Sequence, residues 1–160
     1  MTGDWVMIDK RYFEDFKTGD VAVFGPRHVT REEIVAFAAE FDPQPMHLDE
    51  AVAAATLLGG LGGSGWHSCS LLMRMIADGF IVNSSSMGSP GVEEVRWIKP
   101  LRPGANLRVR MKVLETRASK SRPDMGLIRL AFEMVDDADT LLTTMTTTLM
   151  MGRRESGAAA

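Results

Sequence analysis

Residues 66–82 read WHSCSLLMRMIADGFIV and form the longest stretch of the chain with a helical pattern. The apolar side chains occupy most of the circumference of a helix rather than one stripe, which is typical of a helix buried at the centre of a domain. Arg74 and Asp78 interrupt the stretch, so no run of about 18 apolar residues exists that could span a membrane. We therefore predict one central helix around which the rest of the chain folds.

The segments that follow this helix carry the pattern of half-buried strands. Apolar and polar residues alternate over 107–113 and again over 127–134, and a period of two indicates a β-strand with one buried face. Residues 92–97 and the threonine-rich stretch 141–151 also favour strands, while 21–30 predicts a short strand or a bent pair broken at Gly25-Pro26. Consecutive antiparallel strands with one central helix predict an α+β fold, in which a single sheet wraps the helix.

The segment FDPQPMHLD, residues 41–49, lies between these elements and carries an acid and a histidine. A helix should precede it, because Thr30 to Glu33 match a capping box, and that helix should stop at Pro43. On a continuous helix Asp42 and His47 would point roughly 140° apart. The prolines between them predict instead a stiff, extended or turning segment, in which the two side chains can converge on one point.

Two interpretations of this segment remain open from the residues alone. A carboxylate and an imidazole held together can perform acid–base catalysis on a water molecule. Alternatively, Asp42 ends the preceding helix, Asp49 caps a short alanine-rich helix that reaches about Thr56, and His47 is an ordinary histidine that orders the turn.

Composition sets broad limits on the class of protein. The 160 residues are 45% hydrophobic and 24% charged, which suits one domain with a substantial core. A net charge of −3 argues against a nucleic-acid-binding protein, and a single cysteine indicates a reducing compartment. The N-terminus lacks the apolar segment of a signal peptide. We expect a soluble, cytoplasmic protein with an irregular lead-in over residues 1–19, one domain over 20–151 and a disordered tail over 152–160.

The sequence contains partial matches to other functional motifs, and the residues around them argue against each one. Residues 60–65 match GxGxxG, but they follow a predicted helix rather than a strand, and no βαβ unit is present, so the nucleotide-binding interpretation fails. Trp66 occupies the last position of a GxSxG motif, which disfavours a serine hydrolase. Three histidines without a clustered spacing make a metal site unexpected. The glycines at 59–65 instead form a loop whose backbone can approach a ligand closely.

The stretch FDPQPMHLDEAVAAATLLGGLGGSGWHSCSLLMRM, together with SPGVEEVRWIKPLRPGANLRVRMKV, resembles the MaoC-like dehydratases and R-specific enoyl-CoA hydratases, over about residues 20–150. The resemblance implies a hot-dog fold, a homodimer or higher homo-oligomer, and an acyl tunnel near the subunit interface. It also implies that Asp42 and His47 hold the catalytic water and that the backbone N–H of Ser68 is the oxyanion donor. Gln44 stands where the family usually has asparagine, and Ser68 where it usually has glycine.

The resemblance further implies a lyase of fatty acid metabolism that interconverts a trans-2-enoyl-CoA and an (R)-3-hydroxyacyl-CoA. The substrate is an acyl-CoA thioester, no separate cofactor is needed, and no metal, nucleic acid or membrane partner is expected. A hot-dog thioesterase and a non-catalytic acyl-CoA-binding protein are the alternatives. The residues expected to bind substrate are Gln44, Gly65, Trp66, His67, Arg96, Lys99 and Arg102. The last three could meet the phosphates of coenzyme A or simply form a solvated basic strand end.

Overall fold

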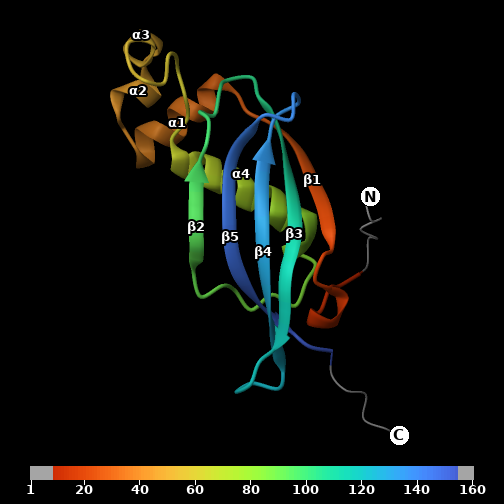
Figure 1. Cartoon of the computed structure of the whole chain (residues 1–160). Coiled ribbons are helices and arrows are strands. Elements are labelled where there is room, and N and C mark those ends of the chain that lie inside the picture. Colours follow the sequence, from red (N-terminus) through yellow and green to blue (C-terminus); the bar gives the residue numbers. More distant parts are fainter. Residues whose placement is uncertain (1–8, 155–160) are drawn as a thin grey trace, which may run out of the picture.

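A five-stranded antiparallel sheet forms the framework of the computed structural model, which describes residues 9–154 (Figure 1). The strands are arranged in the order β1-β3-β4-β5-β2, so β1 and β2 are the two edges. They span Val21–His28 (β1), Val92–Trp97 (β2), Asn106–Ala118 (β3), Met125–Val135 (β4) and Leu141–Gly152 (β5). Each segment that alternated in the sequence is a strand, because its apolar residues face the core at every second position.

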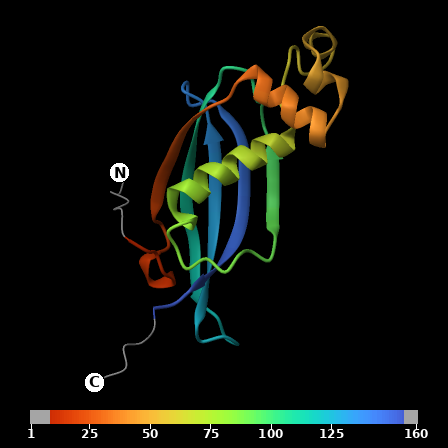
Figure 2. The same ribbon diagram turned by 180° about the vertical axis from the view of Figure 1, so that it is seen from behind.

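Helix α4 (Gly65–Ile76) lies across one face of this sheet and continues into a π-helical turn, η2 (Ala77–Ile81) (Figure 2). Its inward residues pack against the apolar face of the strands to form one core. The core includes Leu71, Leu72, Met75, Ile76, Leu107, Val109, Met111, Ile128, Leu130, Phe132 and Met134. The predicted α+β architecture, with one sheet wrapped on one long helix, is therefore confirmed.

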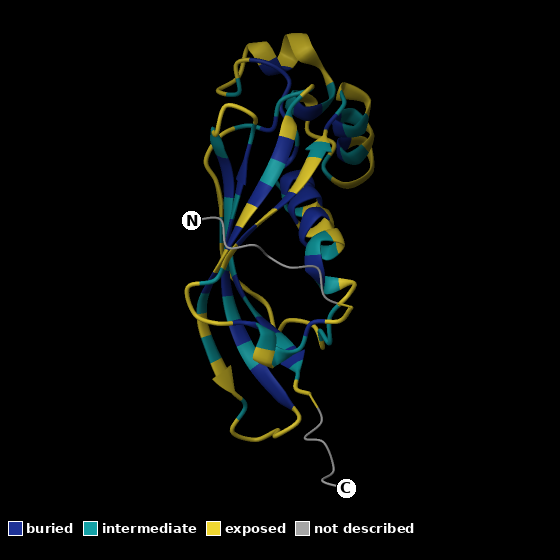
Figure 3. Cartoon of the chain, turned by 90° about the vertical axis from the view of Figure 1, so that its right-hand side faces the viewer, coloured by how far each residue is buried: buried dark blue, intermediate teal, exposed yellow. Residues whose placement is uncertain are grey.

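The helix is buried on one side only, which differs from the expectation of a fully enclosed helix. Trp66 is 62% exposed and Met73 is 45% exposed. Figure 3 shows exposed as well as buried stretches along α4. A single sheet can cover only one face of a helix. The apolar residues around the circumference of α4 therefore leave an uncovered stripe in the single chain.

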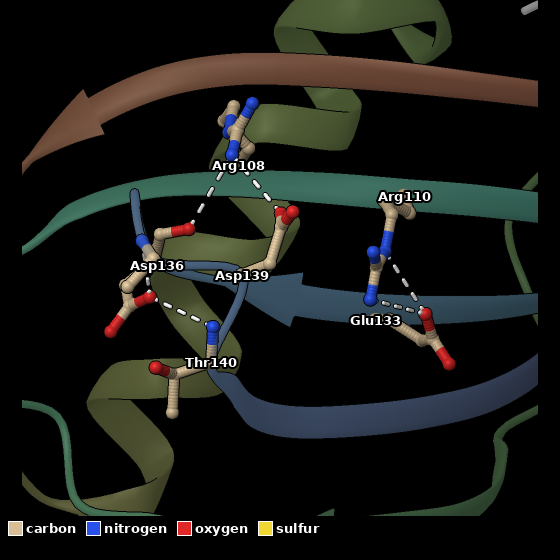
Figure 4. A network of polar contacts seen from close by, with 7 residues as sticks. Arg108, Arg110, Glu133, Asp136, Asp139 and Thr140 are labelled. Atoms are coloured by element: carbon tan, nitrogen blue, oxygen red, sulfur yellow. Dashed lines mark hydrogen bonds and ion pairs between the residues drawn. The ribbon is translucent and has the colours of Figure 1, made fainter.

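Ion pairs between neighbouring strands occupy the opposite face of the sheet. Arg110 on β3 stands directly across from Glu133 on β4 and bonds its carboxylate, and Arg108 bonds Asp139 in the β4–β5 turn (Figure 4). Such exposed pairs contribute little to stability, about 0–1 kcal/mol each. They account for the polar residues that alternate with the core residues along β3 and β4.

Three short helices form a group at one end of the sheet, next to the start of α4 (Figures 1 and 2). They are α1 (Arg31–Phe41), α2 (Pro45–Leu48) and α3 (Glu50–Ala54). The predicted capping box is present at Thr30 and Glu33, and Asp49 caps α3 by accepting from the Val52 N–H at 2.9 Å. The chain enters this group from β1, whose pairing with β3 shifts register between Phe24 and Arg27.

The described ends of the chain meet each other. Phe16 of the lead-in is buried in the core, and a 3-10 turn, η1 (Phe13–Asp15), precedes it. Gly152 belongs to β5, and Arg153 and Arg154 form ion pairs with Glu14 and Asp15 of that turn. The structure differs from the predicted tail at residues 152–154, because Gly152 extends β5 and the next two residues contact the lead-in. Its remaining residues, 155–160, lie outside the described residues, as do residues 1–8 of the lead-in.

Candidate active site

Asp42 and His47 reach the same place from two different elements. Asp42 is the C-terminal cap of α1, and His47 is buried on α2, a one-turn helix that begins at Pro45. The sequence predicted an extended or turning segment, and the structure instead contains this helical turn. Proline is compatible with the first position of a helix, where its missing N–H would have no intrahelical partner. Pro43 and Pro45 thus end one helix and begin another.

The carboxylate of Asp42 and the imidazole of His47 face each other across a short gap. Oδ2 of Asp42 lies 3.5 Å from Nε2 of His47. The other ring nitrogen, Nδ1, lies 2.6 Å from the carbonyl oxygen of Gly62. A carbonyl oxygen can only accept, so Nδ1 carries a proton and donates it. In the neutral ring Nε2 is then a free acceptor directed at Asp42.

Two side chains donate hydrogen bonds to the Asp42 carboxylate. The Ser64 hydroxyl donates to Oδ2 at 2.6 Å, and the Gln44 amide donates to Oδ1 at 2.7 Å. These two bonds lower the pKa of Asp42 below its ordinary value, and the bond from Ser64 has the larger effect. The reason is that hydrogen bonds to the ionised form favour that form. Asp42 is therefore a carboxylate at neutral pH, with its position defined at both oxygens.

The first turn of α4 lies beside this pair, and it shows which N–H groups there already have an acceptor. Helix α4 begins at Gly65 with Ser64 as its N-cap, one residue earlier than predicted. Ser68 is consequently the fourth residue of the helix, and its N–H already donates to the Ser64 carbonyl at 3.1 Å. Among the described residues, the N–H groups of Gly65 and His67 have no hydrogen-bond acceptor. Free N–H groups at a helix start favour negative charge nearby.

A cavity of about 210 Å³ opens at this point between α4 and the segment after β2. Its wall includes the His47 side chain, the α4 residues Gly65 and Ser68, and a set of further residues that are mostly apolar. That set comprises Leu58, Gly63, Trp97, Ile98, Pro100 and Leu101. Gly65 is required sterically, because a Cβ there would collide with the indole ring of Trp97. The cavity can hold an apolar chain with its polar end near His47 and the start of α4.

Two residues expected at the substrate lie elsewhere. His67 points toward α1, where its ring stacks on Phe37 with centroids 4.6 Å apart, and burial lowers its pKa. Trp66 lies on the exposed side of α4 and packs edge-on against Trp97, with centroids 5.5 Å apart. Neither lines the cavity. Their roles as substrate contacts are therefore not supported by the single chain.

The three basic residues expected near coenzyme A have three different environments. Lys99 lines the cavity, whereas Arg96 is exposed and pairs with Glu94 on its own strand at 3.0 Å. Arg102 donates to the carbonyl oxygens of Gly60 at 2.8 Å and Leu61 at 3.1 Å, and also to that of Leu58. The Arg102 guanidinium is thus directed at the glycine loop, and a contact between Arg102 and a phosphate of coenzyme A stays a prediction.

Other kinds of site find little support in residues 9–154. No group of three or more His, Cys, Asp or Glu side chains in this range could hold a metal ion. No helix in the same range is long and apolar enough to cross a membrane. Burial raises the pKa of the Cys69 thiol, which makes it a weak nucleophile.

Ser64 is the residue that sequence reasoning missed. A serine before an apolar helical run is a recognised N-cap signal, and that signal was present at Ser64-Gly65. Its bond to Asp42 spans 22 positions in the chain. No local pattern shows such a contact, because it depends on how α1 and α4 pack.

The sequence and the fold of this chain were compared with those of known proteins, and both comparisons point to one family. An antiparallel sheet wrapped on one long helix is the hot-dog fold. The model of the MaoC-like domain matches residues 16–128, so the chain belongs to the MaoC-like dehydratase family.

Individual proteins resemble this chain in sequence or in fold. The uncharacterized protein YdeM of Bacillus subtilis (strain 168) is 28% identical over 116 residues, which cover 72% of this chain and 80% of that protein. The crystal structure of a MaoC-like dehydratase from Rhodospirillum rubrum is 34% identical, with a TM-score of 0.82, and covers 91% of this chain and 99% of its own. An unliganded R-hydratase from Pseudomonas aeruginosa shares the fold, with a TM-score of 0.72, 22% identity and coverage of 89% and 86%.

Proposed function

We propose that this protein is a hydro-lyase that adds water to a trans-2-enoyl-CoA thioester, or removes it from the (R)-3-hydroxyacyl-CoA. The observation that carries the proposal is the Asp42–His47 pair, whose facing atoms are 3.5 Å apart beside a cavity at a helix start. Two acceptors at that separation can each receive one O–H of a single water molecule. We further propose that it acts in the cytoplasm as a homodimer.

The chemistry divides between this pair and α4. A water proton passes to the Asp42–His47 pair while the water oxygen bonds to Cβ of the substrate. The electron pair of the C=C bond shifts toward the thioester, which gains enolate character. The same pair then returns the proton to Cα, so that water has been added across the double bond with no net change of protons.

The developing negative charge on the thioester oxygen needs hydrogen-bond donors that are already in place. The free N–H of Gly65 is suited to this role, because Gly65 lines the cavity and begins α4. Ser68 is not proposed as the donor, because its N–H is committed to Ser64. It contributes to the cavity wall.

A screen of enoyl-CoA thioesters of different chain length tests the proposal. Hydration removes the conjugated double bond, so the absorbance of the enoyl thioester should fall while no free thiol appears. Asp42→Asn should abolish this change and keep the fold, since Asp42 caps α1 outside the hydrophobic core. Release of coenzyme A thiol would indicate a thioesterase. Binding of enoyl-CoA with no turnover of any substrate would indicate the non-catalytic alternative and would refute the lyase.

A further inference from the structure

Ser64 joins two parts of the site that come from different elements. Its side chain is fully buried, at 0% exposure. The hydroxyl donates to Oδ2 of Asp42 at 2.6 Å and accepts from the N–H of Trp66 at 3.3 Å. A hydroxyl has one proton to donate. Because that proton is directed at Asp42 and a lone pair is directed at α4, the side chain has one defined orientation.

We propose that Ser64 is a positioning residue that fixes the Asp42 carboxylate relative to the start of α4. Catalysis by this site needs the water, held by Asp42 and His47, and the N–H donor of Gly65 to keep a constant separation. Ser64 precedes Gly65 in the chain and bonds Asp42 directly, so it sets that separation. The inference rests on the proposed hydro-lyase function and deepens it.

The other hydrogen bond to Asp42 cannot replace this one. Gln44 is an exposed neighbour two positions away, and it bonds Oδ1, on the opposite side of the carboxylate. Ser64 bonds Oδ2, which is the oxygen nearest to His47. Without Ser64 the carboxylate would be held only by its own segment and could rotate away from His47. His47 is the titratable group that faces Asp42, while Ser64 and Gln44 are uncharged.

The test compares Ser64→Ala, Ser64→Gly and Ser64→Thr with the unaltered protein. Glycine is nearly as good an N-cap as serine, whereas alanine is not, so the first two variants separate the cap from the bond to Asp42. Threonine keeps the hydroxyl. Thr30→Ala is the matched control, because it removes the cap of α1 without touching Asp42. For each protein, kcat, KM and the thermal melting temperature are measured. The Asp42 carboxyl group is titrated by ¹³C NMR. The Asp42 signal is identified as the one that is missing from the spectrum of Asp42→Asn.

We expect Ser64→Ala and Ser64→Gly to lower kcat by about 10- to 100-fold, the range for one hydrogen bond to a charged group, with KM little changed. Both should raise the pKa of Asp42 toward the ordinary value, whereas Ser64→Thr and Thr30→Ala should leave it low. Thr30→Ala should retain kcat. If Ser64→Thr does not fold, the alanine and glycine variants carry the comparison, because both lack the hydroxyl.

The proposal is overturned if Ser64→Ala and Ser64→Gly leave the Asp42 titration and kcat unchanged. It is also overturned if Ser64→Gly behaves as the unaltered protein while Ser64→Ala and Thr30→Ala only melt earlier, because Ser64 would then be a helix cap alone. The NMR titration needs no substrate. A protein that hydrates no enoyl thioester would therefore contradict the proposed function separately, and the titration would still decide whether Ser64 holds Asp42.

Discussion

The two ring nitrogens of His47 have separate hydrogen-bonding roles, as the proposed action on a water molecule requires. Nδ1 donates to the Gly62 carbonyl, and this bond leaves Nε2 as the acceptor that faces Asp42. The proline-bounded spacing predicted that Asp42 and His47 converge, and they do. The partners that define their chemical states, Ser64 and the Gly62 carbonyl, lie 22 and 15 positions away and could not be predicted from the segment itself.

The lowered pKa of Asp42 has a consequence for stability that can be measured. A group whose pKa is lower in the folded protein contributes stability above its unfolded pKa and loses it as the pH falls through the folded value. The ordinary value for Asp42 is 3.8. The ionised carboxylate should therefore stabilise the protein fully at neutral pH and progressively less in acid. Protonated aspartate resembles asparagine, so the difference in unfolding free energy between the unaltered protein and Asp42→Asn should shrink in acid.

Urea unfolding of both proteins, from about pH 6 to about pH 3, measures this difference. A gap between the unaltered protein and Asp42→Asn that stays constant over the whole range would contradict the ionised, hydrogen-bonded state of Asp42.

At the scale of elements, the sequence predicted the strands and the longer helices, but it missed the one-turn helix α2 and set the start of α4 one residue late. The strands β3 and β4 follow directly from alternation, β2 and β5 from residues that favour strands, and the caps of α1 and α3 from Thr30 and Asp49. With the helix starting at Gly65, the N–H groups that lack an acceptor among the described residues are those of Gly65 and His67, and the Ser68 N–H donates to the Ser64 carbonyl. A shift of one residue in a helix boundary therefore changes which N–H donors are available.

From the sequence, the turn between β2 and β3 could be a solvated basic segment. In the structure, one of its basic residues, Arg102, forms hydrogen bonds to the glycine loop. Arg102 bonds three loop carbonyls, and the Gly63 N–H donates to the Leu101 carbonyl at 2.8 Å. The next loop carbonyl, that of Gly62, is the one that orients His47. Alternation and charge could not reveal this contact, since the two segments lie about 40 positions apart in the chain.

Arg102→Lys should therefore disturb catalysis as well as stability. A lysine cannot reproduce the planar donor group that reaches three carbonyls at once. We expect a loss of about 2–3 kcal/mol in unfolding free energy and a fall of at least tenfold in kcat, with KM changed less. Denaturant unfolding and steady-state kinetics provide the measurements.

Arg96→Lys is the control for this change, because its exposed pair with Glu94 should contribute almost nothing. A rise in KM for the coenzyme A thioester with kcat and stability preserved would contradict the loop role of Arg102. It would support the phosphate contact predicted from the sequence.

For the whole molecule, the single sheet leaves an apolar surface uncovered. Trp66 and Met73 lie on the outer side of α4, and Trp97 and Val92 lie on β2, an unpaired edge of the sheet. Unpaired edges and exposed apolar patches are surfaces that a second chain can cover. The resemblance stated from the sequence implied association, and these exposed residues are where we expect the contact to lie.

We predict that the protein sediments as a dimer or a larger homo-oligomer and that Met73→Glu weakens this association. A carboxylate at that position would have to be buried without a partner. Ala118→Glu is the matched control, because it adds the same charge at the exposed end of β3, far from β2. Sedimentation velocity at several concentrations measures both variants. A stable, active monomer of the unaltered protein would contradict the prediction.

The central claim is that Asp42 and His47 act as one unit on one water molecule. The measurement that tests it most directly is the rate of enoyl-CoA hydration by Asp42→Asn, His47→Ala and the double variant, with thermal melts alongside. Residues that act as a unit give losses that do not multiply. Each single change should lower kcat by about 10³-fold or more, the double variant should resemble the worse single one, and all three should remain folded. Losses that multiply would show two separate roles, and an active Asp42→Asn enzyme would contradict the account.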